Sequence, residues 1–500
     1  MINRPRLSRT EQVTLWALIA LAFLLRVYKL DAPLWFDEIM TLIHYVRLPV
    51  NQLVADYSSF NNHLFYSLQA KAAVSVFGES VWALRLPALV FGVGSVWALW
   101  RLARTALGGR ESLLAAALLA LSYHHIWFSQ NARGYTELMF WCLAALIIFV
   151  EAIGSRSRSA WAAFGLVLAA AMYTHLTAAF FIAAMGIAYA GMLVATWFRL
   201  PISQRFRAPE QRSTQLAPLW GFALGGIVTL ILCAPAIPQM SALVGSVSES
   251  SEVDLMQEYQ NPFWTLLEGM RTLGGSSVLM MIAIPAAVIS GAVGFAGLLR
   301  RSPVIAVVGV LHVVLTLAAL LVMNMRIWPR FFFTDIAFAF LFITHGLFVC
   351  AAFFGKLAGR IGWPALSPSR LFGLAAFATI AASAVLATRN YDFPKQDFPG
   401  AIEIIGNAPP NSVGAVGLAG EVYAPYLNTG WREIRTADEL SMLTPFDGRR
   451  WAVVIFPSRT ERERADVLSV LEQDFTLVHT LPGTLGDGEV VVYASKPIIR

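Results

Sequence analysis

Eleven stretches of about 18 or more mostly apolar residues recur along the chain, and this feature restricts its fold more than any other. A helix needs about 20 such residues to cross the roughly 30 Å hydrocarbon core of a membrane. The stretches lie at about 13–30, 81–103, 111–128, 135–153, 160–174, 177–197, 216–238, 277–299, 303–323, 331–354 and 370–388. The fifth is short, and the fifth and sixth together can also form one broken hairpin. We therefore predict a polytopic α-helical membrane protein with about 11 transmembrane helices.

The composition supports a membrane location and excludes several other classes of protein. Of the 500 residues, 57% are hydrophobic and only 14% are charged, which leaves too little polar surface for a soluble domain of this size. The net charge of +6 does not indicate a nucleic-acid partner, because the basic residues lie in alternate loops. The three cysteines each fall inside an apolar stretch, so we expect no disulfide and no cysteine metal site. The first stretch lacks a small-residue cleavage site after it, which favours a retained anchor over a signal peptide.

The basic residues predict the orientation of the chain in the membrane. Cytoplasmic loops are enriched in Lys and Arg, and every second loop here is basic. These residues are Arg4, Arg6, Arg9, Arg101, Arg104, Arg110, Arg156, Arg158, Arg199, Arg205, Arg207, Arg212, Arg300, Arg301, Lys356, Arg360 and Arg370. We predict a cytoplasmic N-terminus, and with eleven spans the C-terminal segment lies outside the cytoplasm.

The composition changes at about residue 390. The last 110 or so residues contain short valine-rich runs, "SVGAVGLA", "RWAVVIFPS", "FTLVHTL" and "EVVVYAS", separated by turns and by the charged "RTERERADVLSVLEQ". Such runs are typical of strands and the charged segment of a helix. We predict a transmembrane domain at 1–389 and a small extracytoplasmic α/β domain at 390–500. The motif "GAVGLAG" lacks the spacing of a dinucleotide site, so we interpret it as a strand followed by a loop.

Titratable and amide residues collect in the loops predicted to be external. The loop at 31–80, with juxtamembrane helices, contains Asp37 and Glu38 in "LWFDE" and Asn62 and His63 in "NNHLFY". Later external segments add Arg133, Tyr135, Glu137, His175, Arg326 and Arg330. Ionisable side chains at the edge of a membrane are costly unless they face a cavity or a partner. We therefore predict one external cavity lined by these segments.

Each of these residues also has a purely structural interpretation. Asp37 can cap the helix that follows it, because Asp accepts hydrogen bonds from free N–H groups at a helix start. Glu38 can be a solvated carboxylate in the first turn. The histidines can pack at the interface, and the arginines can extend to the lipid headgroups. The residues alone leave both interpretations open.

Five motifs, in this order, resemble those of the GT-C glycosyltransferases: "LWFDE", "NNHLFY", "WALRLPALVFG", "QNARGY" and "WPRFFF". The likeness extends from about residue 10 to 390 and is greatest to bacterial relatives of the dolichyl-phosphate-mannose protein mannosyltransferases and of the lipid A aminoarabinose transferase. This family transfers a sugar from a polyprenyl-phosphate carrier to an acceptor outside the cytoplasm, usually with inversion. The resemblance implies an enzyme of this class, located in a bacterial inner (plasma) membrane.

The resemblance also implies roles for matching residues. Asp37 matches the catalytic base and Glu38 the neighbouring acid, while Arg133 and Arg330 match basic positions near the donor phosphate. The family often has "HPPLYY" where this chain has "NNHLFY", and Arg-Tyr where this chain has Arg330-Phe331.

The chemistry of these residue types is consistent with those roles. A phosphate-linked sugar carries an activated leaving group, so one carboxylate is enough to deprotonate the acceptor hydroxyl, and direct displacement inverts the anomeric centre. Glu38 is expected to orient the acceptor or raise the pKa of Asp37. Guanidinium groups match the oxygens of the departing phosphate. The residues expected to bind the donor phosphate or sugar are Arg133, Arg330, His63, Tyr135, His175, Glu137 and Asn62.

Other functions remain open at this point. A lipid or solute transporter (a flippase) would favour charged groups near the bilayer centre and an inverted repeat, and a non-catalytic scaffold could use the C-terminal domain. A transferase of a charged group such as phosphoethanolamine would need a larger external domain. We predict no metal ligands and no required cofactor besides the lipid-linked donor, although a carboxylate pair near histidines could hold a divalent ion. The sugar and the acceptor, whether lipid, glycan or protein, stay undetermined.

Overall fold

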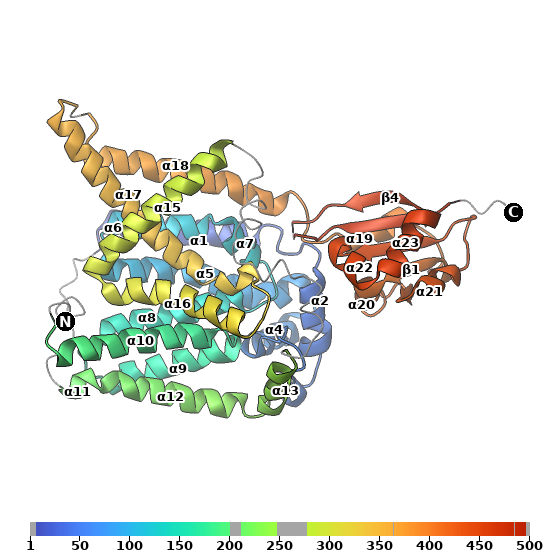
Figure 1. The fold of residues 1–500 in the computed structure, drawn as a ribbon, viewed down its shortest axis with the longest axis horizontal. Coiled ribbons are helices and arrows are strands. Elements are labelled where there is room, and N and C mark those ends of the chain that lie inside the picture. The colour runs from blue at the N-terminus through green and yellow to red at the C-terminus, as the bar shows by residue number, and fades with distance from the viewer. Residues whose placement is uncertain (1–6, 201–211, 248–277, 364, 485, 497–500) are drawn as a thin grey trace.

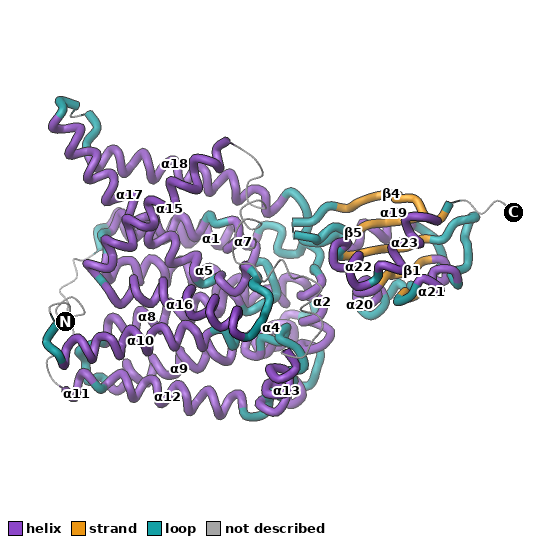
Figure 2. The backbone as a smooth tube through the Cα atoms, viewed as in Figure 1, coloured by secondary structure: helices purple, strands orange, loops and turns teal. Residues whose placement is uncertain are grey.

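The computed structural model describes residues 7–200, 212–247, 278–363, 365–484 and 486–496. The chain forms a bundle of long helices with a smaller α/β domain at one end (Figure 1). Figure 2 shows that every strand lies in this smaller domain. The predicted fold class is therefore confirmed. The basic residues Arg4, Arg6, Arg205 and Arg207, and the loop at 248–277, lie outside the described residues.

Each of the eleven predicted spans coincides with a helix or a helix pair. The long helices are α1 (Arg9–Val27), α5 (Val81–Ala106), α6 (Gly109–Ala120), α7 (Tyr123–Ser129), α8 (Tyr135–Ala152), α9 (Arg158–Thr174), α10 (Ala178–Trp197), α12 (Ala217–Cys233), α15 (Val278–Arg301), α16 (Pro303–Val322), α17 (Asp335–Arg360) and α18 (Pro368–Thr388). Within the described ranges, nine helices are long and apolar enough to cross a membrane, and α6 with α7 gives a tenth. The one long helix outside this set, α9, has 17 residues. The predicted break between the fifth and sixth stretches is present as the turn between α9 and α10.

The span formed by α6 and α7 is bent by 59°, and a buried arginine compensates the break. The last carbonyl groups of a helix have no partner within it, and lipid offers none. Arg26 of α1, which is fully buried, donates to the carbonyl oxygens of Leu119 and Ala120 at 3.3 and 3.1 Å and to Ser129 Oγ at 3.0 Å. The kinked span therefore depends on a side chain from another helix.

The two ends of the bundle differ in charge and in structure. The N-terminal start of α1 and the short helix α11 (Arg212–Gln215) lie at one end, and the α/β domain lies at the other with α2, α4 and α13 (Figure 1). The basic loops of the described chain gather at the first end, which we call the basic end. The second end, which we call the domain end, corresponds to the side predicted to be external.

Short elements build the domain end of the bundle. Its first loop folds into α2 (Phe36–Thr41), a wide π turn at Leu42–Val46, α3 (Val50–Leu53) and α4 (Leu64–Phe77). Two later segments add α13 (Ile237–Val247) and a 3₁₀ turn at Pro329–Phe332.

The C-terminal domain contains a five-stranded mixed sheet with the order β2-β1-β3-β5-β4. The first three strands in that order run parallel, and β5 pairs antiparallel with β3 and β4. Its elements are α19 (Phe398–Ile405), β1 (Val413–Val416), α20 (Gly420–Tyr423), β2 (Arg432–Ile434), α21 (Ala437–Ser441), β3 (Trp451–Ile455), α22 (Pro457–Glu463), α23 (Ala465–Asp474), β4 (Phe475–Leu481) and β5 (Val490–Ser495). The proposed boundary near residue 390 falls between α18 and α19.

The domain packs directly on the first loop of the bundle. Apolar side chains from both parts, including Ile39 and Met40 of α2 and Val413 and Phe398 of the domain, form one buried cluster. The ring of Phe36 meets that of Phe456 edge to face at 5.5 Å. This shared core brings the domain against α2, which carries Asp37.

Candidate functional site

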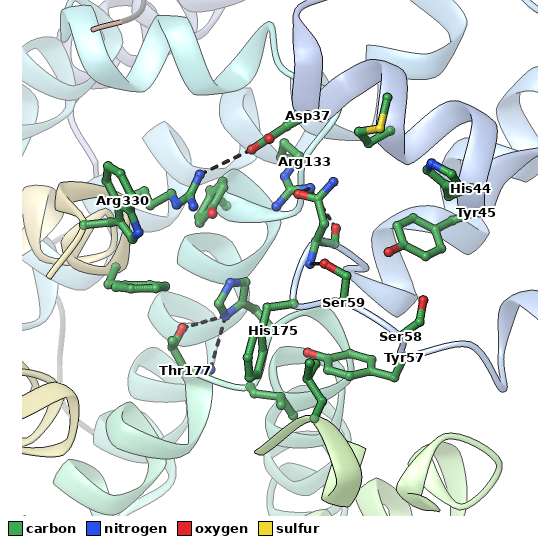
Figure 3. A pocket seen from close by; sticks show the side chains of 18 of the residues that line it. Asp37, His44, Tyr45, Tyr57, Ser58, Ser59, Arg133, His175, Thr177 and Arg330 are labelled. Carbon is green, nitrogen blue, oxygen red and sulfur yellow. Dashed lines mark hydrogen bonds and ion pairs between the residues drawn. The ribbon is translucent and has the colours of Figure 1, made fainter. Parts of the chain in front are cut away.

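A cavity of about 1160 Å³ opens at the domain end of the bundle, where the predicted polar loops meet. Five predicted site residues line it, from segments far apart in the sequence: Asp37, Arg133, Tyr135, His175 and Arg330. Figure 3 shows Asp37, Arg133 and Arg330 close together on one side of the cavity, with His175 below them. The structure therefore brings the principal predicted carboxylate and both predicted guanidinium groups into one chamber.

Asp37 is the second residue of α2, and its side chain pairs with Arg330 from the turn before α17. Arg330 Nη1 lies 3.3 Å from Asp37 Oδ2, and both side chains keep partial access to the cavity, with 34% and 17% of their surfaces exposed. The guanidinium also lies over the ring of Trp328, 5.2 Å from its centroid. Asp37 accepts no capping hydrogen bond of α2 through its side chain, so the capping interpretation does not apply.

Arg133 is held by the segment that precedes α4. Its Nη1 donates to the Asn61 backbone oxygen at 2.7 Å, to Asn61 Oδ1, and to Thr41 Oγ1 at 3.4 Å. Its Nη2 lies 3.2 Å from His63 Nε2. Among the described residues, Arg133 Nε has no hydrogen-bond partner although it is buried. The guanidinium is thus fixed in place while part of its donor capacity stays unused.

The hydrogen bonds of His175 define which of its ring nitrogens carries the proton. The backbone N–H of Thr177 donates to His175 Nδ1 at 3.2 Å. A nitrogen that accepts cannot carry hydrogen, so a neutral His175 ring has its proton on Nε2. Burial, with Arg133 and then Arg330 adding to it, lowers the pKa of His175 to about 3, so this residue is a neutral N–H donor at physiological pH. Burial likewise holds the pKa of His63 well below its ordinary value, and both ring nitrogens of His63 face N–H groups: Nδ1 lies 2.8 Å from the backbone N of Gly134 and Nε2 lies 3.2 Å from Arg133 Nη2.

Glu38 does not face the cavity, which corrects the expectation that it contacts the acceptor. Its side chain is fully buried and forms a two-pronged ion pair with Arg85 of α5, with Oε1 2.7 Å from Nε and Oε2 2.6 Å from Nη2. It also accepts from the backbone N–H groups of Trp35 at 3.2 Å and Ala132 at 2.7 Å. Burial raises the pKa of Glu38, but Arg85, Lys395 and the backbone N–H of Ala132 together outweigh burial and hold the pKa below its ordinary value.

The position of Glu38 suits a positioning role. Its carboxylate accepts hydrogen bonds from the backbone N–H groups of Trp35, which precedes α2, and of Ala132, which precedes Arg133. Glu38 therefore links the segment that carries Asp37 to the segment that carries Arg133. Arg85 extends this network by donating to the carbonyl oxygens of Leu30, Ala32 and Pro33 at 2.7, 2.7 and 3.2 Å.

Three other predicted residues are buried behind the cavity and do not line it. Asn62 donates to the backbone oxygen of Asp56 at 2.7 Å and accepts from Ser67. Glu137 accepts from Gln69 at 2.5 Å and from Trp141 at 3.1 Å. His63 supports the chamber from behind, with its ring 4.5 Å from that of His175. In this structure Asn62 and Glu137 are buried and do not face the cavity, so their contact with a bound donor stays a prediction from the sequence.

Comparisons with known proteins agree with this architecture. Residues 64–205 match the family model of the dolichyl-phosphate-mannose-protein mannosyltransferases. No curated protein matches the chain by sequence. The structure is similar to the oligosaccharyltransferase of Archaeoglobus fulgidus tethered with an acceptor peptide, with 12% identity and a TM-score of 0.53 over 98% of this chain and 74% of that one. It is also similar to apo ArnT from Cupriavidus metallidurans, with 14% identity and a TM-score of 0.50 over 97% of this chain and 98% of that one.

The chain has the GT-C fold. The resemblance predicted from the motifs is confirmed, and the matched family and neighbours are of the predicted class, glycosyltransferases. A third similar structure is the Archaeoglobus fulgidus AglB in complex with an inhibitory peptide and a dolichol-phosphate, with 12% identity and a TM-score of 0.50 over 94% of this chain and 73% of that one.

The sequence did not predict two residues of this site, Arg85 and Lys395. Arg85 lies inside an apolar span, and an ionisable residue in such a position is a signal in itself. Lys395 follows the last span and is buried against the site, with Nζ 3.9 Å from Glu38 Oε2 and 5.1 Å from the centre of the Trp127 ring. Nothing in the local sequence distinguishes Lys395, because only the docking of the C-terminal domain brings it there.

The described part of the chain contains no group of three His, Cys, Asp or Glu side chains arranged to hold a metal ion. Of the carboxylates that line the cavity, Asp37 lies beside a guanidinium, which is a poor environment for a divalent cation.

His175 should make the stability of the protein sensitive to acid. The pKa of a histidine in the unfolded chain is about 6.5, whereas that of His175 in the fold is about 3. Between these values the unfolded state binds a proton that the folded state does not, so stability is fully present above about pH 6.5 and is lost as pH falls toward 3. We expect His175→Gln to reduce the drop in unfolding temperature between pH 7 and pH 5. His479→Gln, at an exposed position on β4, is the control, and equal acid sensitivity of the two variants would contradict the assignment.

Proposed function

We propose that the protein is an integral membrane glycosyltransferase that moves a sugar from a polyprenyl-phosphate donor to an acceptor hydroxyl, with inversion. The observation that carries this proposal is the single cavity in which Asp37 meets Arg133 and Arg330. We further propose that the protein lies in a bacterial plasma membrane with its basic end in the cytoplasm, which would put the cavity on the opposite side.

The cavity offers a phosphate group mainly hydrogen-bond donors. Arg133 and Arg330 each have a buried Nε with no partner among the described residues. His175 adds an N–H group, because its Nδ1 already accepts. Phosphate oxygens only accept, so a set of donors is complementary to them, and guanidinium groups match them in a fork geometry. Positioned donors of this kind stabilise the charge that develops on a leaving phosphate.

Asp37 would act as the general base. In the ligand-free structure it is paired with Arg330, and a donor phosphate would compete for that guanidinium. Transfer of Arg330 to the phosphate would leave Asp37 to accept the proton of the acceptor hydroxyl. Attack of this oxygen on the anomeric carbon, with departure of the polyprenyl phosphate, inverts the centre in one step.

The cavity reaches the ends of two spans, where a lipid chain can enter. Leu176 and Phe180 line it at the start of α10, and Leu320, Met323 and Phe331 line it at the end of α16 and beyond. An apolar side next to Arg133 and Arg330 suits a carrier whose hydrocarbon tail stays in the bilayer. The matched family, named for a dolichyl-phosphate donor, and the neighbour in complex with a dolichol-phosphate support a lipid-linked donor.

The transporter hypothesis receives less support. Two buried His–carboxylate pairs lie within the bundle, His312 with Asp335 and His345 with Glu111, each at 2.7 Å. Both pairs join neighbouring helices, and none of these four residues lines the cavity. The two pairs link α17 to its neighbours, α16 and α6.

Binding of the lipid carrier tests the proposal directly. We expect Arg330→Ala to weaken binding of undecaprenyl phosphate in a direct titration by about tenfold to a hundredfold, the equivalent of about 1.5–3 kcal/mol for a hydrogen bond to a charged group. Arg360→Ala, at an exposed position at the other end of α17, is the matched control and should bind as the native protein does. Unchanged affinity of Arg330→Ala would count against its phosphate role.

A further inference from the structure

One wall of the cavity differs chemically from the donor cluster around Arg133 and Arg330. We call it the hydroxyl wall. It consists of the lining residues between 43 and 59, namely Ile43, His44, Tyr45, Leu48, Asp56, Tyr57, Ser58 and Ser59. Figure 3 shows His44, Tyr45, Tyr57, Ser58 and Ser59 on the side of the cavity away from Arg330. This wall has no lysine or arginine, and its one carboxylate is Asp56.

A wide helical turn places consecutive residues of this wall along the cavity. The backbone N–H of Arg47 donates to the oxygen of Leu42, five residues earlier, at 3.0 Å. Successive side chains of an α-helix diverge by about 100°, yet Ile43, His44 and Tyr45 all line the cavity. Single π turns of this type are rare and occur frequently at functional sites.

The part of the wall from Asp56 to Ser59 is linked by hydrogen bonds to Arg133, one of the proposed hydrogen-bond donors to the phosphate. The backbone N–H of Ser58 donates to Asp56 Oδ1 at 2.9 Å, and that of Asn61 donates to Ser59 Oγ at 3.1 Å. Asn61 in turn accepts from Arg133 through its backbone and its side chain. A group covalently attached to a phosphate on Arg133 therefore lies next to this wall.

The side chains of the wall can both donate and accept hydrogen bonds. Burial, with Asp56 adding to it, raises the pKa of Tyr45, and burial raises the pKa of Tyr57, so both phenols keep their protons. Hydroxyl groups donate one hydrogen bond and accept others, whereas an ionised carboxylate only accepts. This mixture is complementary to sugar hydroxyls, which also do both. The rings of Tyr57 and Phe60, 6.4 Å apart, add an apolar surface at the same place.

We propose that the hydroxyl wall binds the sugar carried by the donor, and that this sugar has no acidic group. The inference rests on the proposed function, because it is the phosphate on Arg133 that directs the sugar to this wall. A uronic acid would bring its carboxylate toward Asp56 with no cation on the wall to compensate, and like charges at short range repel. Arg133 and Arg330 are the proposed partners of the phosphate, and the other two arginines that line the cavity, Arg326 and Arg459, lie outside the hydroxyl wall. A neutral sugar or an amino sugar meets no such conflict.

Matched lipid-linked sugars provide the test. The probes are undecaprenyl phosphate alone, its glucosyl and mannosyl phosphodiesters, and the corresponding glucuronosyl and mannuronosyl compounds, each titrated against the purified full-length protein. We expect at least one neutral sugar to bind about tenfold or more tighter than the bare phosphate, and each uronosyl compound to bind more weakly than its neutral counterpart. Asp56→Asn should reduce the difference in affinity between each neutral compound and its uronosyl counterpart.

A tyrosine variant separates the sugar contribution from the phosphate contribution. Tyr45→Phe should reduce the affinity for the favoured neutral compound by about twofold to tenfold, as expected for one hydrogen bond, and leave the affinity for undecaprenyl phosphate unchanged. Tyr426→Phe, at a position of the C-terminal domain that does not line the cavity, should change neither. A uronosyl compound that binds as tightly as its counterpart, or a sugar that adds no affinity, would overturn the inference. Failure of undecaprenyl phosphate itself to bind would overturn the proposed function as well.

Discussion

Asp37→Asn is expected to reduce sugar transfer by about a hundredfold to ten-thousandfold, the usual contribution of a general base. Asparagine keeps the size of the side chain but cannot accept the proton of the acceptor hydroxyl. The variant should still insert in the membrane, because Asp37 is partly exposed and only its pairing with Arg330 is lost. Transfer of a labelled sugar from the lipid-linked donor pool of membranes that contain the variant measures the effect.

The same substitution should leave donor binding intact or strengthen it. Removing the carboxylate frees Arg330 for the phosphate, so undecaprenyl phosphate should bind Asp37→Asn at least as tightly as the native protein. Asp392→Asn removes the same charge from an exposed position on the same side of the protein and serves as the control. If Asp37→Asn keeps near-normal turnover, or if it loses donor binding together with turnover, Asp37 is not the base.

Glu38→Gln is expected to destabilise the protein by about 3–5 kcal/mol, the usual cost of breaking a buried ion pair. Glutamine keeps the shape of the side chain but leaves the buried guanidinium of Arg85 without an anion. Loss of this link should also separate the residues that position Asp37 and Arg133, so transfer should fall together with stability. Thermal unfolding in detergent, compared with transfer activity, measures both effects.

Comparison of Glu38→Gln with Glu79→Gln separates the effect of breaking a buried ion pair from the effect of breaking an exposed one. Glu79→Gln breaks the Arg47–Glu79 ion pair, whose side chains are 43% and 46% exposed, and should cost less than about 1 kcal/mol. The double variant Glu38→Gln with Arg85→Gln should recover part of the stability, because no unpaired charge stays buried. It should not recover transfer, since Arg85 also binds three carbonyl oxygens of the loop before Asp37. Equal destabilisation by Glu38→Gln and Glu79→Gln would contradict this account.

The helices of the fold could be predicted because their signal is local. A run of about 20 apolar residues has few alternatives to a membrane helix, since lipid leaves no other partner for backbone groups. One departure from the predicted helices arises where a tertiary contact acts. The predicted span at 111–128 is bent, and its free carbonyl groups are satisfied by Arg26, about 90 residues away in the chain. No local pattern could indicate that contact.

Part of the candidate site was predicted from the sequence. Why a residue was placed correctly or incorrectly differs from one residue to the next. Asp37 and Arg330 were expected to share a chamber because both lie at the external ends of spans, and they do. Glu38 is adjacent to Asp37 in sequence, but neighbouring residues on a helix point in different directions, and Glu38 is buried against Arg85. The prediction could not tell these two carboxylates apart, since the direction of each depends on what packs against α2.

The sequence by itself was enough to predict that the chain is a multi-span membrane protein, which segments are long and apolar enough to cross, and which polar loops gather at one end of the bundle. These properties depend on the free energy of moving each segment from water to lipid, and that quantity is nearly additive along the chain. Only the tertiary structure decided which carboxylate faces the cavity, which guanidinium groups can bind an anion, and how the C-terminal domain covers the site. Those outcomes depend on directional contacts between residues as much as 360 positions apart, such as Phe36 and Gln396, and such contacts exist only once the helices have packed.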